Sequence, residues 1–360
     1  MTQETRSGPL AGLRIVEFSG IGPGPHCVML LADLGAEVLR IDRAGGNGWP
    51  NPIVDRGRHA LELDIRSDEG RAQVLEIVAN ADVVVEGFRP GVMERLGLGP
   101  DVLLERNPRL IYGRMTGWGQ AGPLAQAAGH DINYIAITGA LAAIGDGKRP
   151  IPPLNLVGDF GGGSLYLAFG IMAALFERQT SGKGQVVDAA IVDGVASLMA
   201  MFAGLIPSGA LSLDPARNPL AGQAPFYRCY ECADGNFISV GPIEPHFYAE
   251  LLGHIEAPAE LREKQNDSRN WSERTALLED IFAKKSRDEW CGLLEGTDAC
   301  FAPVLTFEES KSHPHMLARE IYLEKDGVTH IAPAPRFSRT PGDIGAGGTG
   351  ADLAERWSRA

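Results

Sequence analysis

Residues 13–42 read LRIVEFSGIGPGPHCVMLLADLGAEVLRID, in which two runs rich in β-branched residues flank a glycine-rich turn and an apolar segment. We predict strands over Leu13–Phe18 and Glu37–Asp42 and a helix over Cys27–Leu34 between them. A strand, a helix and a second strand in this order are typical of parallel strands joined by a crossover helix. The stretch therefore predicts the first unit of an α/β sheet.

The same alternation continues through the first half of the chain. Further strands are predicted at His59–Asp64, Asp82–Glu86, Arg109–Met115 and Gln185–Ile191, and further helices at Ser67–Ala79, Asp101–Arg106, Ile132–Leu141, Ser164–Gln179 and Gly194–Leu205. Strands that alternate with helices favour a doubly wound parallel sheet with helices on both faces. We therefore expect an α/β fold with a Rossmann-like large domain.

Residues 204–225 are rich in Gly, Pro, Ala and Asn without periodicity, which is typical of a linker between domains. After them, Ala233-Asp234-Gly235 predicts a hairpin turn between strands at residues 226–231 and 236–240. Helices are predicted at Pro245–His254, Glu273–Lys285 and Arg287–Leu294, the last with a capping box of Ser286 and Glu289. We expect a large domain over residues 1–203, a linker over 204–225, a small α+β domain over 226–320, and a C-terminal segment over 321–360 that returns to the large domain.

The composition excludes several classes of partner. Among 360 residues, 33 are basic and 46 acidic, and a net charge of -13 does not suit nucleic acid or an anionic membrane. A phosphate-bearing ligand would need a local group of arginines. The five cysteines include one close pair, Cys229 and Cys232, too few for a disulfide framework or a complete zinc site, so we expect no metal.

The two ends of the sequence and its longest apolar run indicate where in the cell the protein is located. Met1–Pro9 does not resemble a signal peptide, and the longest apolar run, Leu165–Phe176, is too short to span a bilayer. The ending Ser358-Arg359-Ala360 is a poor match to a peroxisomal signal. We therefore expect a cytoplasmic protein without a membrane partner.

The turn Gly20-Ile21-Gly22-Pro23-Gly24-Pro25 is similar to a dinucleotide-binding motif, with Asp42 at the end of the next strand. However, Pro25 stands where that motif has its third glycine, and the two prolines remove backbone donors that a pyrophosphate would need. Two interpretations remain at this point, nicotinamide dinucleotide binding and a tight turn between strand and helix.

Two segments place an ionisable side chain among glycines at a predicted helix start. His130 lies in GHDINY, residues 129–134, and Asp159 lies in GDFGGG, residues 158–163. A helix N-terminus favours the neutral imidazole, which can act as a base. The glycines after Asp159 could let a substrate carbonyl approach backbone N–H groups. Alternatively, Asp159 is only a helix cap and His130 only a packed histidine.

Long blocks spread over the chain carry a family resemblance. They are Pro9–Arg14, Arg114–Gln120, Gly129–Tyr134, Asn155–Gly163, Ser181–Gln185, Tyr230–Gly235 and Pro335–Thr340. In these blocks the chain resembles the α-methylacyl-CoA racemases of the family III CoA-transferase (CaiB/BaiF-type) superfamily, from about residue 9 to 340. The resemblance implies an interlocked homodimer with sites shared between subunits. It also implies an acyl-CoA thioester substrate from fatty acid metabolism and no cofactor, because coenzyme A enters with the substrate.

The resemblance also implies roles for single residues. His130 and Asp159 resemble the opposed acid/base pair, Asp131 resembles the acid that assists the histidine, and Glu244 resembles a glutamate that reaches the histidine from the partner subunit. Glu244 could instead cap the helix that begins at Pro245. The implied CoA contacts are Arg43, Leu63, Asp64, Ile65, Arg66, Gly87, Phe88, Arg89, Arg95, Gly129, Ile132, Asn133 and Tyr134. We expect the backbone of Gly158 and Gly161 to hold an oxyanion.

The predicted activity is a 1,1-proton transfer that interconverts (R)- and (S)-2-methylacyl-CoA through an enolate, with His130 and Asp159 on opposite faces. The alternatives are a family III CoA-transferase in which Asp159 is the nucleophile, and a CoA-binding protein without activity. His130 favours the racemase, because transferases of the superfamily do not generally carry a histidine in this block. Met199 and Met201 either line the acyl-chain surface or pack in a core helix, so the preferred acyl chain stays open.

Overall fold

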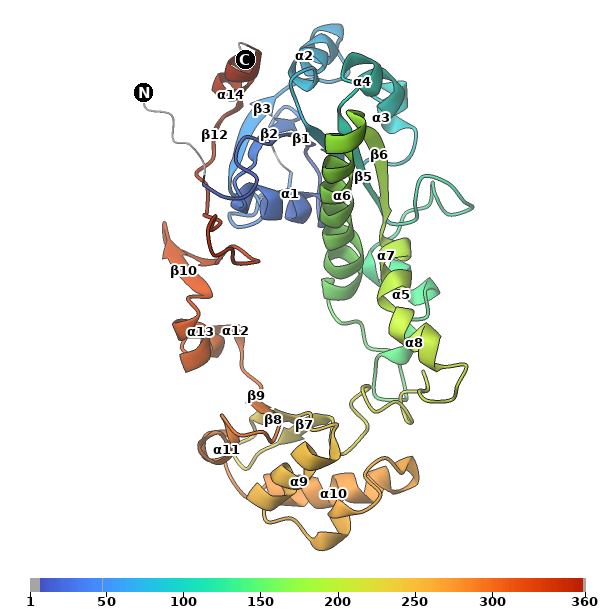
Figure 1. The fold of residues 1–360 in the computed structure, drawn as a ribbon, viewed down its shortest axis with the longest axis vertical. Helices are drawn as coiled ribbons and strands as arrows, with labels where there is room; N and C mark the ends of the chain where they lie inside the picture. Colours follow the sequence, from blue (N-terminus) through green and yellow to red (C-terminus); the bar gives the residue numbers. More distant parts are fainter. Residues whose placement is uncertain (1–6, 47, 359–360) are drawn as a thin grey trace. The chain divides into compact units, whose positions relative to one another are not determined.

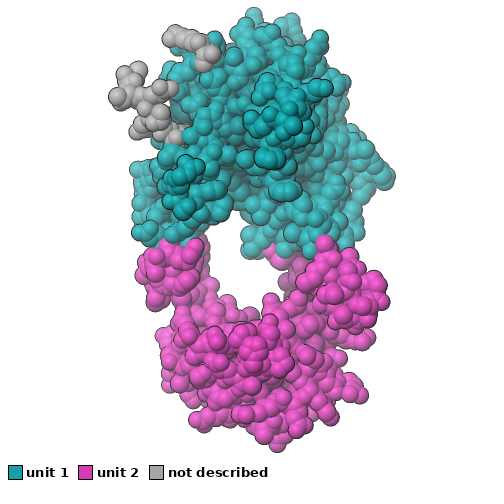
Figure 2. Space-filling model, in the orientation of Figure 1, with its two compact units in different colours: residues 1–138, 154–198, 320–360 teal, residues 139–153, 199–319 magenta. Residues whose placement is uncertain are grey.

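The computed structural model describes residues 7–46 and 48–358. The expectations about a presequence and a peroxisomal ending rest partly on residues 1–6 and 359–360, which lie outside the described residues. The chain divides into two compact units (Figure 2): unit 1 contains residues 1–138, 154–198 and 320–360, and unit 2 contains 139–153 and 199–319. These limits differ from the expected ones, because residues 139–153 form only a short 3-10 turn and a β-bridge and add nothing to the sheet.

Unit 1 is built on a seven-stranded sheet with the order β12-β3-β2-β1-β4-β5-β6, in which every pair of neighbours is parallel. The strands are β1 (Arg14–Phe18), β2 (Glu37–Asp42), β3 (Arg58–Glu62), β4 (Val83–Glu86), β5 (Ile111–Thr116), β6 (Gln185–Ala190) and β12 (Gly348–Thr349). The order from β3 to β6 is that of doubly wound nucleotide-binding folds. The predicted parallel α/β sheet is confirmed, and β12 is an additional edge strand that the sequence did not predict.

Helices cover both faces of this sheet (Figure 1). On one face α6 (Leu165–Ser181) packs against β5, where Gly113 leaves room for Leu167 and Ile171, and against α1 (Pro23–Asp33). On the other face Tyr112, the neighbour of Gly113, joins a buried cluster with side chains of α2 (Asp68–Val78), α4 (Pro100–Arg106) and α14 (Gly350–Ser358). Successive side chains of a strand point to opposite faces, so each strand serves both layers.

A π-helix, Leu156–Ser164, runs directly into α6. The predicted helix at Ser164–Gln179 therefore begins earlier than expected, and the continuous helix over Leu156–Ser181 is 26 residues long. By length and composition alone it could cross a membrane, contrary to the estimate from the shorter apolar run. Core helices of globular proteins pass the same test, and this one packs against β5, β6 and α7 (Ile191–Leu198).

Shorter elements complete unit 1. Helix α3 (Val92–Arg95) follows β4, and α5 (Asp131–Ile137) ends before the predicted Leu141. The hairpin of β10 (Tyr322–Lys325) and β11 (Val328–Ile331) belongs to the C-terminal part of this unit. The helix predicted over residues 194–205 is divided at Met199 into α7 and α8 (Ala200–Leu205), and α8 belongs to unit 2.

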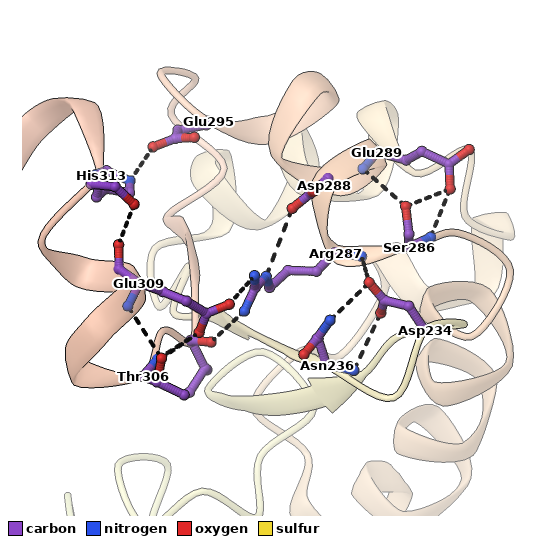
Figure 3. Close-up of polar contacts among 12 residues, drawn as sticks. Asp234, Asn236, Ser286, Arg287, Asp288, Glu289, Glu295, Thr306, Glu309 and His313 are labelled. Atoms are coloured by element: carbon purple, nitrogen blue, oxygen red, sulfur yellow. Dashed lines mark hydrogen bonds and ion pairs between the residues drawn. The ribbon is translucent and has the colours of Figure 1, made fainter.

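Unit 2 packs helices against a three-stranded antiparallel sheet of β7 (Arg228–Glu231), β8 (Phe237–Val240) and β9 (Phe301–Pro303). Its helices are α8, α9 (Pro245–His254), α10 (Trp271–Phe282), α11 (Arg287–Leu294), α12 (Phe307–Ser310) and α13 (Pro314–Ala318). The predicted hairpin and the Ser286–Glu289 capping box are both present. Arg287 joins three elements: its N–H donates to Asp234 in the hairpin turn, and its Nη2 donates to Glu309 of α12 at 2.6 Å (Figure 3).

Candidate active site

A cavity of about 1380 Å³ opens in unit 1 at the carboxyl ends of five parallel strands. Its walls include the residues that directly follow these strands, among them Ser19 after β1, Arg43 after β2, Leu63 after β3, Gly87 after β4 and Gly117 after β5. Ligands of open α/β sheets bind at this edge, where the connections to the helices diverge. The cavity is therefore the candidate active site.

The cavity gathers a basic cluster in an acidic chain. Arg43, Arg66, Arg89 and Arg95 all line it, although the net charge of the protein is -13. Arginine binds phosphate oxygens through paired N–H donors, so four such groups suit a ligand with several phosphates. Other expected CoA contacts that line the cavity are Leu63, Asp64, Ile65, Gly87, Phe88, Gly129 and Tyr134. Ile132 and Asn133 are exposed and do not line it.

His130 lines the same cavity as the N-cap residue of α5. Its backbone N–H donates to Asn133 Oδ1 at 3.0 Å, so the side chain of Asn133 closes the first turn of the helix. This bond gives the side chain of Asn133 a structural role, and its expected contact with the ligand stays a prediction. The imidazole is exposed and free to meet a ligand in the cavity.

Two aromatic rings hold the chain just before His130. Trp118 and Tyr134 meet edge to face with ring centroids 4.7 Å apart, and the Tyr134 hydroxyl donates to the carbonyl of Gly129. A Cβ on Gly129 would lie 2.8 Å from the Tyr134 ring and 2.9 Å from the Trp118 ring. Only glycine fits at this position, so the rings fix the backbone that carries the histidine.

Asp131 contacts the second candidate base rather than the histidine. It is 7% exposed, and its Oδ2 accepts the backbone N–H of Asp159 at 2.7 Å. A Cβ on Gly158 would lie 2.3 Å from the same oxygen, so the close approach requires glycine there. Asp131 thereby joins the first turn of α5 to the π-helix that carries Asp159.

Asp159 lines the cavity from the π-helix and is half-buried. Burial raises the pKa of its carboxyl group, and the charge of Asp131 raises it further. A hydrogen bond from Asn155 Nδ2, at 3.5 Å, and the nearby His130 act in the opposite direction. A carboxyl group with a raised pKa is better able both to donate and to accept a proton near neutral pH.

The glycines after Asp159 have a different role from the one expected. A Cβ on Gly162 would lie 2.6 Å from Val195 Cγ2, and a Cβ on Gly194 would lie 1.9 Å from the Gly162 carbonyl oxygen. These glycines let the π-helix pack closely against α7. Gly158 and Gly161 do not line the cavity, and the Asp159 N–H is already bonded to Asp131. The described geometry therefore lends no support to the expected oxyanion site, which stays a prediction.

The glycine-rich turn forms the part of the cavity wall next to the π-helix. Residues Gly20–Pro25 all line the cavity, and α1 begins at Pro23 after Gly22, whose φ is 73°. A Cβ on Gly22 would lie 3.6 Å from Asp159 Oδ2, and one on Gly163 would lie 3.1 Å from Pro23 Cβ. The geometry favours the interpretation as a tight turn, which here packs beside the candidate base.

One expected site residue belongs to the other unit. Glu244 lies in unit 2, exposed, at the N-cap of α9 and without a side-chain cap bond. Three further residues at or beside the site were not predicted: Trp49, Trp118 and Asn155. Trp118 and Asn155 lie inside motifs that were noticed for other residues, whereas Trp49, which lines the cavity, has no pattern around it that could have identified it. Among residues 7–46 and 48–358 no group of three metal-binding side chains occurs.

Comparison with known proteins places these features in a family. The model of CoA-transferase family III matches residues 10–348. The chain is 47% identical to alpha-methylacyl-CoA racemase of Mus musculus over 334 residues, covering 92% of this chain and 87% of the relative. It is 45% identical to the Homo sapiens racemase over 338 residues, with the same coverage of both chains. An acyl-CoA transferase of Fusarium pseudograminearum is 32% identical over 368 residues, with 92% and 79% coverage.

A solved structure is also similar over the whole chain. The CAIB/BAIF family protein from Brucella suis aligns with a TM-score of 0.82 and 26% identity, covering 98% of this chain and 100% of that one. The family match extends over most of the sequence, and the cavity, its arginines and both candidate bases lie within the matched residues. This chain belongs to CoA-transferase family III.

Proposed function

We propose that this protein is a racemase that interconverts (R)- and (S)-2-methylacyl-CoA thioesters. The observation that carries the proposal is that His130 and Asp159, from two separate helix starts, line one cavity together with four arginines. Identity of 45–47% to racemases, against 32% to an acyl-CoA transferase, supports the same activity.

The proton moves between two groups on opposite faces of the α-carbon. One base, the His130 imidazole for one epimer and the Asp159 carboxylate for the other, removes the α-proton and leaves an enolate. The other group, in its protonated form, donates a proton to the opposite face, so the thioester is re-formed with inverted configuration. The raised pKa of Asp159 supports this double role, because its carboxyl group must be protonated in one direction and ionised in the other.

Asp131 is a positioning residue in this scheme. It does not line the cavity, and its carboxylate holds the backbone N–H of Asp159. Since that N–H is occupied, it is not available to the enolate oxygen. When His130 takes the proton, the resulting imidazolium faces the enolate and stabilises its charge.

The active protein is proposed to be a cytoplasmic homodimer in which Glu244 of one subunit supports His130 of the other. An apolar stripe on α6 supports self-association: Leu165, Phe169 and Phe176 recur at helical spacing and are 52%, 72% and 81% exposed. Large exposed apolar surfaces of this kind mark protein interfaces. Glu244 is exposed and, in the described part of the chain, makes no cap bond, so its carboxylate is free for such a role.

The alternative is transfer of CoA between acids, with Asp159 attacking the thioester carbonyl to form a mixed anhydride and release CoA thiolate. The test is proton NMR of each 2-methylacyl-CoA epimer with the protein in deuterated buffer, without added metal or nicotinamide. A racemase removes the α-proton signal of both epimers and brings them to a nearly equal mixture. Retention of the α-proton, with CoA exchange into an added free acid, would show a transferase instead.

The same assay shows which of the two bases acts on each face of the α-carbon. His130→Gln and Asp159→Asn should each abolish interconversion, because each group is needed once as base and once as acid. Deuterium exchange without inversion should persist in each variant for the epimer whose base remains. The two variants should therefore exchange opposite epimers. If both exchange the same epimer, the assignment of one base to each face is wrong.

A further inference from the structure

A buried arginine joins the two ends of one segment of the cavity wall. Arg114, on β5, is 6% exposed, and its Nε donates to Glu86 Oε1 at 3.0 Å. Its Nη1 and Nη2 donate to the two carboxylate oxygens of Glu94 at 2.8 and 3.3 Å. Glu86 is the last residue of β4 and Glu94 lies on α3. One guanidinium group therefore fixes both ends of residues 86–94.

One ligand-facing arginine, Arg89, lies between these ends, and a second, Arg95, directly follows Glu94 on α3. Arg89 and Arg95 line the cavity, whereas Arg114 and Glu94 do not. The second oxygen of Glu86, Oε2, accepts the backbone N–H of Phe88 at 2.7 Å, so the turn that presents Arg89 is held as well.

Arg95 is placed by the same turn. The Nη1 atom of Arg95 lies close to Gly91, where an added Cβ would be 3.1 Å away. Gly91 has a φ of 82° and is the N-cap residue of α3. A left-handed conformation at this position favours glycine, and the lack of a side chain there also leaves room for the guanidinium of Arg95.

We propose that Glu86, Arg114 and Glu94 act as a clamp that holds Arg89 and Arg95 at the spacing needed to bind the phosphates of a CoA thioester. The inference rests on the proposed function, in which this cavity binds CoA. Arg114 and Glu94 act through other residues and are positioning residues. Two charged donors at a fixed separation bind a phosphate-rich ligand more tightly than two mobile ones, because less side-chain freedom is lost on binding.

The negative charge of Glu94 allows the clamp to be distinguished from a purely electrostatic effect on CoA binding. An acid adjacent in sequence to Arg95 repels an anionic ligand, so removal of its charge should strengthen CoA binding if long-range electrostatics were its only effect. The clamp predicts the opposite sign. Release of Arg114 from Glu94 should loosen α3 and weaken CoA binding.

The experiment measures the dissociation constant of CoA by isothermal titration calorimetry for the wild type and for Glu94→Ala. We expect about tenfold weaker binding in the variant, because the misplaced arginines no longer fit the phosphates together. Glu105→Ala is the matched control: Glu105 is an exposed acid on α4 that does not line the cavity. It removes the same charge and should change CoA binding by less than about twofold.

Two further measurements separate positioning from general damage. With a racemisable acyl-CoA, Glu94→Ala should raise KM while kcat stays close to that of the wild type. With the corresponding acyl-pantetheine, which lacks the nucleotide and its phosphates, KM should be the same in both proteins. Glu94→Gln keeps the shape and one hydrogen-bond acceptor, so it should weaken CoA binding less than Glu94→Ala does.

Two results would overturn the clamp. One is CoA binding to Glu94→Ala that is as tight as, or tighter than, binding to the wild type. The other is an equal loss of affinity for acyl-CoA and acyl-pantetheine in a variant with unchanged circular dichroism. Failure of the wild type to bind CoA at all would instead contradict the proposed function.

Discussion

Asp131 influences Asp159 in two ways, through a hydrogen bond to its backbone and through its charge. Its Oδ2 accepts the Asp159 N–H and fixes the backbone, while its negative charge raises the pKa of the Asp159 carboxyl group. A change to asparagine separates the two effects, because an amide oxygen can still accept the hydrogen bond but carries no charge.

Asp131→Asn should therefore lower the pKa of Asp159. Asp159 must be ionised to act as a base, so a lower pKa leaves it active at lower pH. For the epimer deprotonated by Asp159, we expect the acidic limb of the kcat/KM profile to move to lower pH. Asp101→Asn, an exposed change on α4, should leave the limb in place. An acidic limb that stays fixed or moves upward in Asp131→Asn would contradict the role assigned to its charge.

The sequence predicts the two candidate bases but not the residues that hold them in place. His130 and Asp159 were found because each lies among glycines at a helix start within a family block. The bond between Asp131 and Asp159 joins residues 28 positions apart and depends on how α5 faces the π-helix. No local pattern contains that information, so Asp131 was assigned to the adjacent histidine instead.

Among the elements, the contact between the π-helix and α7 determines where Asp159 stands. Gly162 and Gly194 bring the two backbones together so closely that neither position has room for a methyl group. Small residues at a helix crossing allow this approach, and any larger side chain forces the helices apart. The contact lies three residues beyond Asp159, so a shift there moves the candidate base.

Gly194→Ala should destabilise the protein by about 2 kcal/mol, since its Cβ would meet the Gly162 carbonyl. It should also reduce kcat, because Asp159 is displaced. Gly204→Ala on α8 is the matched control, since nothing lies within 4 Å of its added Cβ. Alanine there should leave stability unchanged or raise it by up to about 1 kcal/mol. Chemical denaturation measures both, and a Gly194→Ala protein as stable as the wild type would contradict the close packing.

The regular elements were predictable where a residue pattern defines them. Most of the strands from β1 to β6 carry apolar runs bounded by turn residues, and all six were predicted within a few residues. The π-helix was not, because four of its nine residues are glycine, which disfavours a helix in a sequence-based prediction. Strand β12 consists of Gly348 and Thr349 and has no apolar run at all.

For the molecule as a whole, a site shared between two subunits predicts a result that a site within one chain does not. If His130 of one subunit works with Glu244 of the other, each dimer has two composite sites. His130→Ala and Glu244→Ala proteins should each be nearly inactive. Co-expression of the two chains should give about half mixed dimers, each with one intact site, and restore roughly a quarter of wild-type activity.

Affinity tags on the two chains allow the mixed dimers to be isolated before the assay, so that assembly is verified separately from activity. Isolated mixed dimers without activity would mean that Glu244 acts within its own chain or only at the start of α9. A fully active Glu244→Ala protein would remove Glu244 from the site altogether.

The C-terminal strand and helix of unit 1 have a consequence for how the protein is made. Leu353 and Trp357 of α14 are each 1% exposed in the same core cluster as Val16 of β1, and Trp357 Nε1 donates to Glu37. A ribosome therefore synthesises all of unit 2 before it supplies the side chains that complete this core. During that interval the apolar side chains of the first strands lack part of their core and are prone to aggregate. We therefore expect the nascent chain to benefit from binding a chaperone during translation.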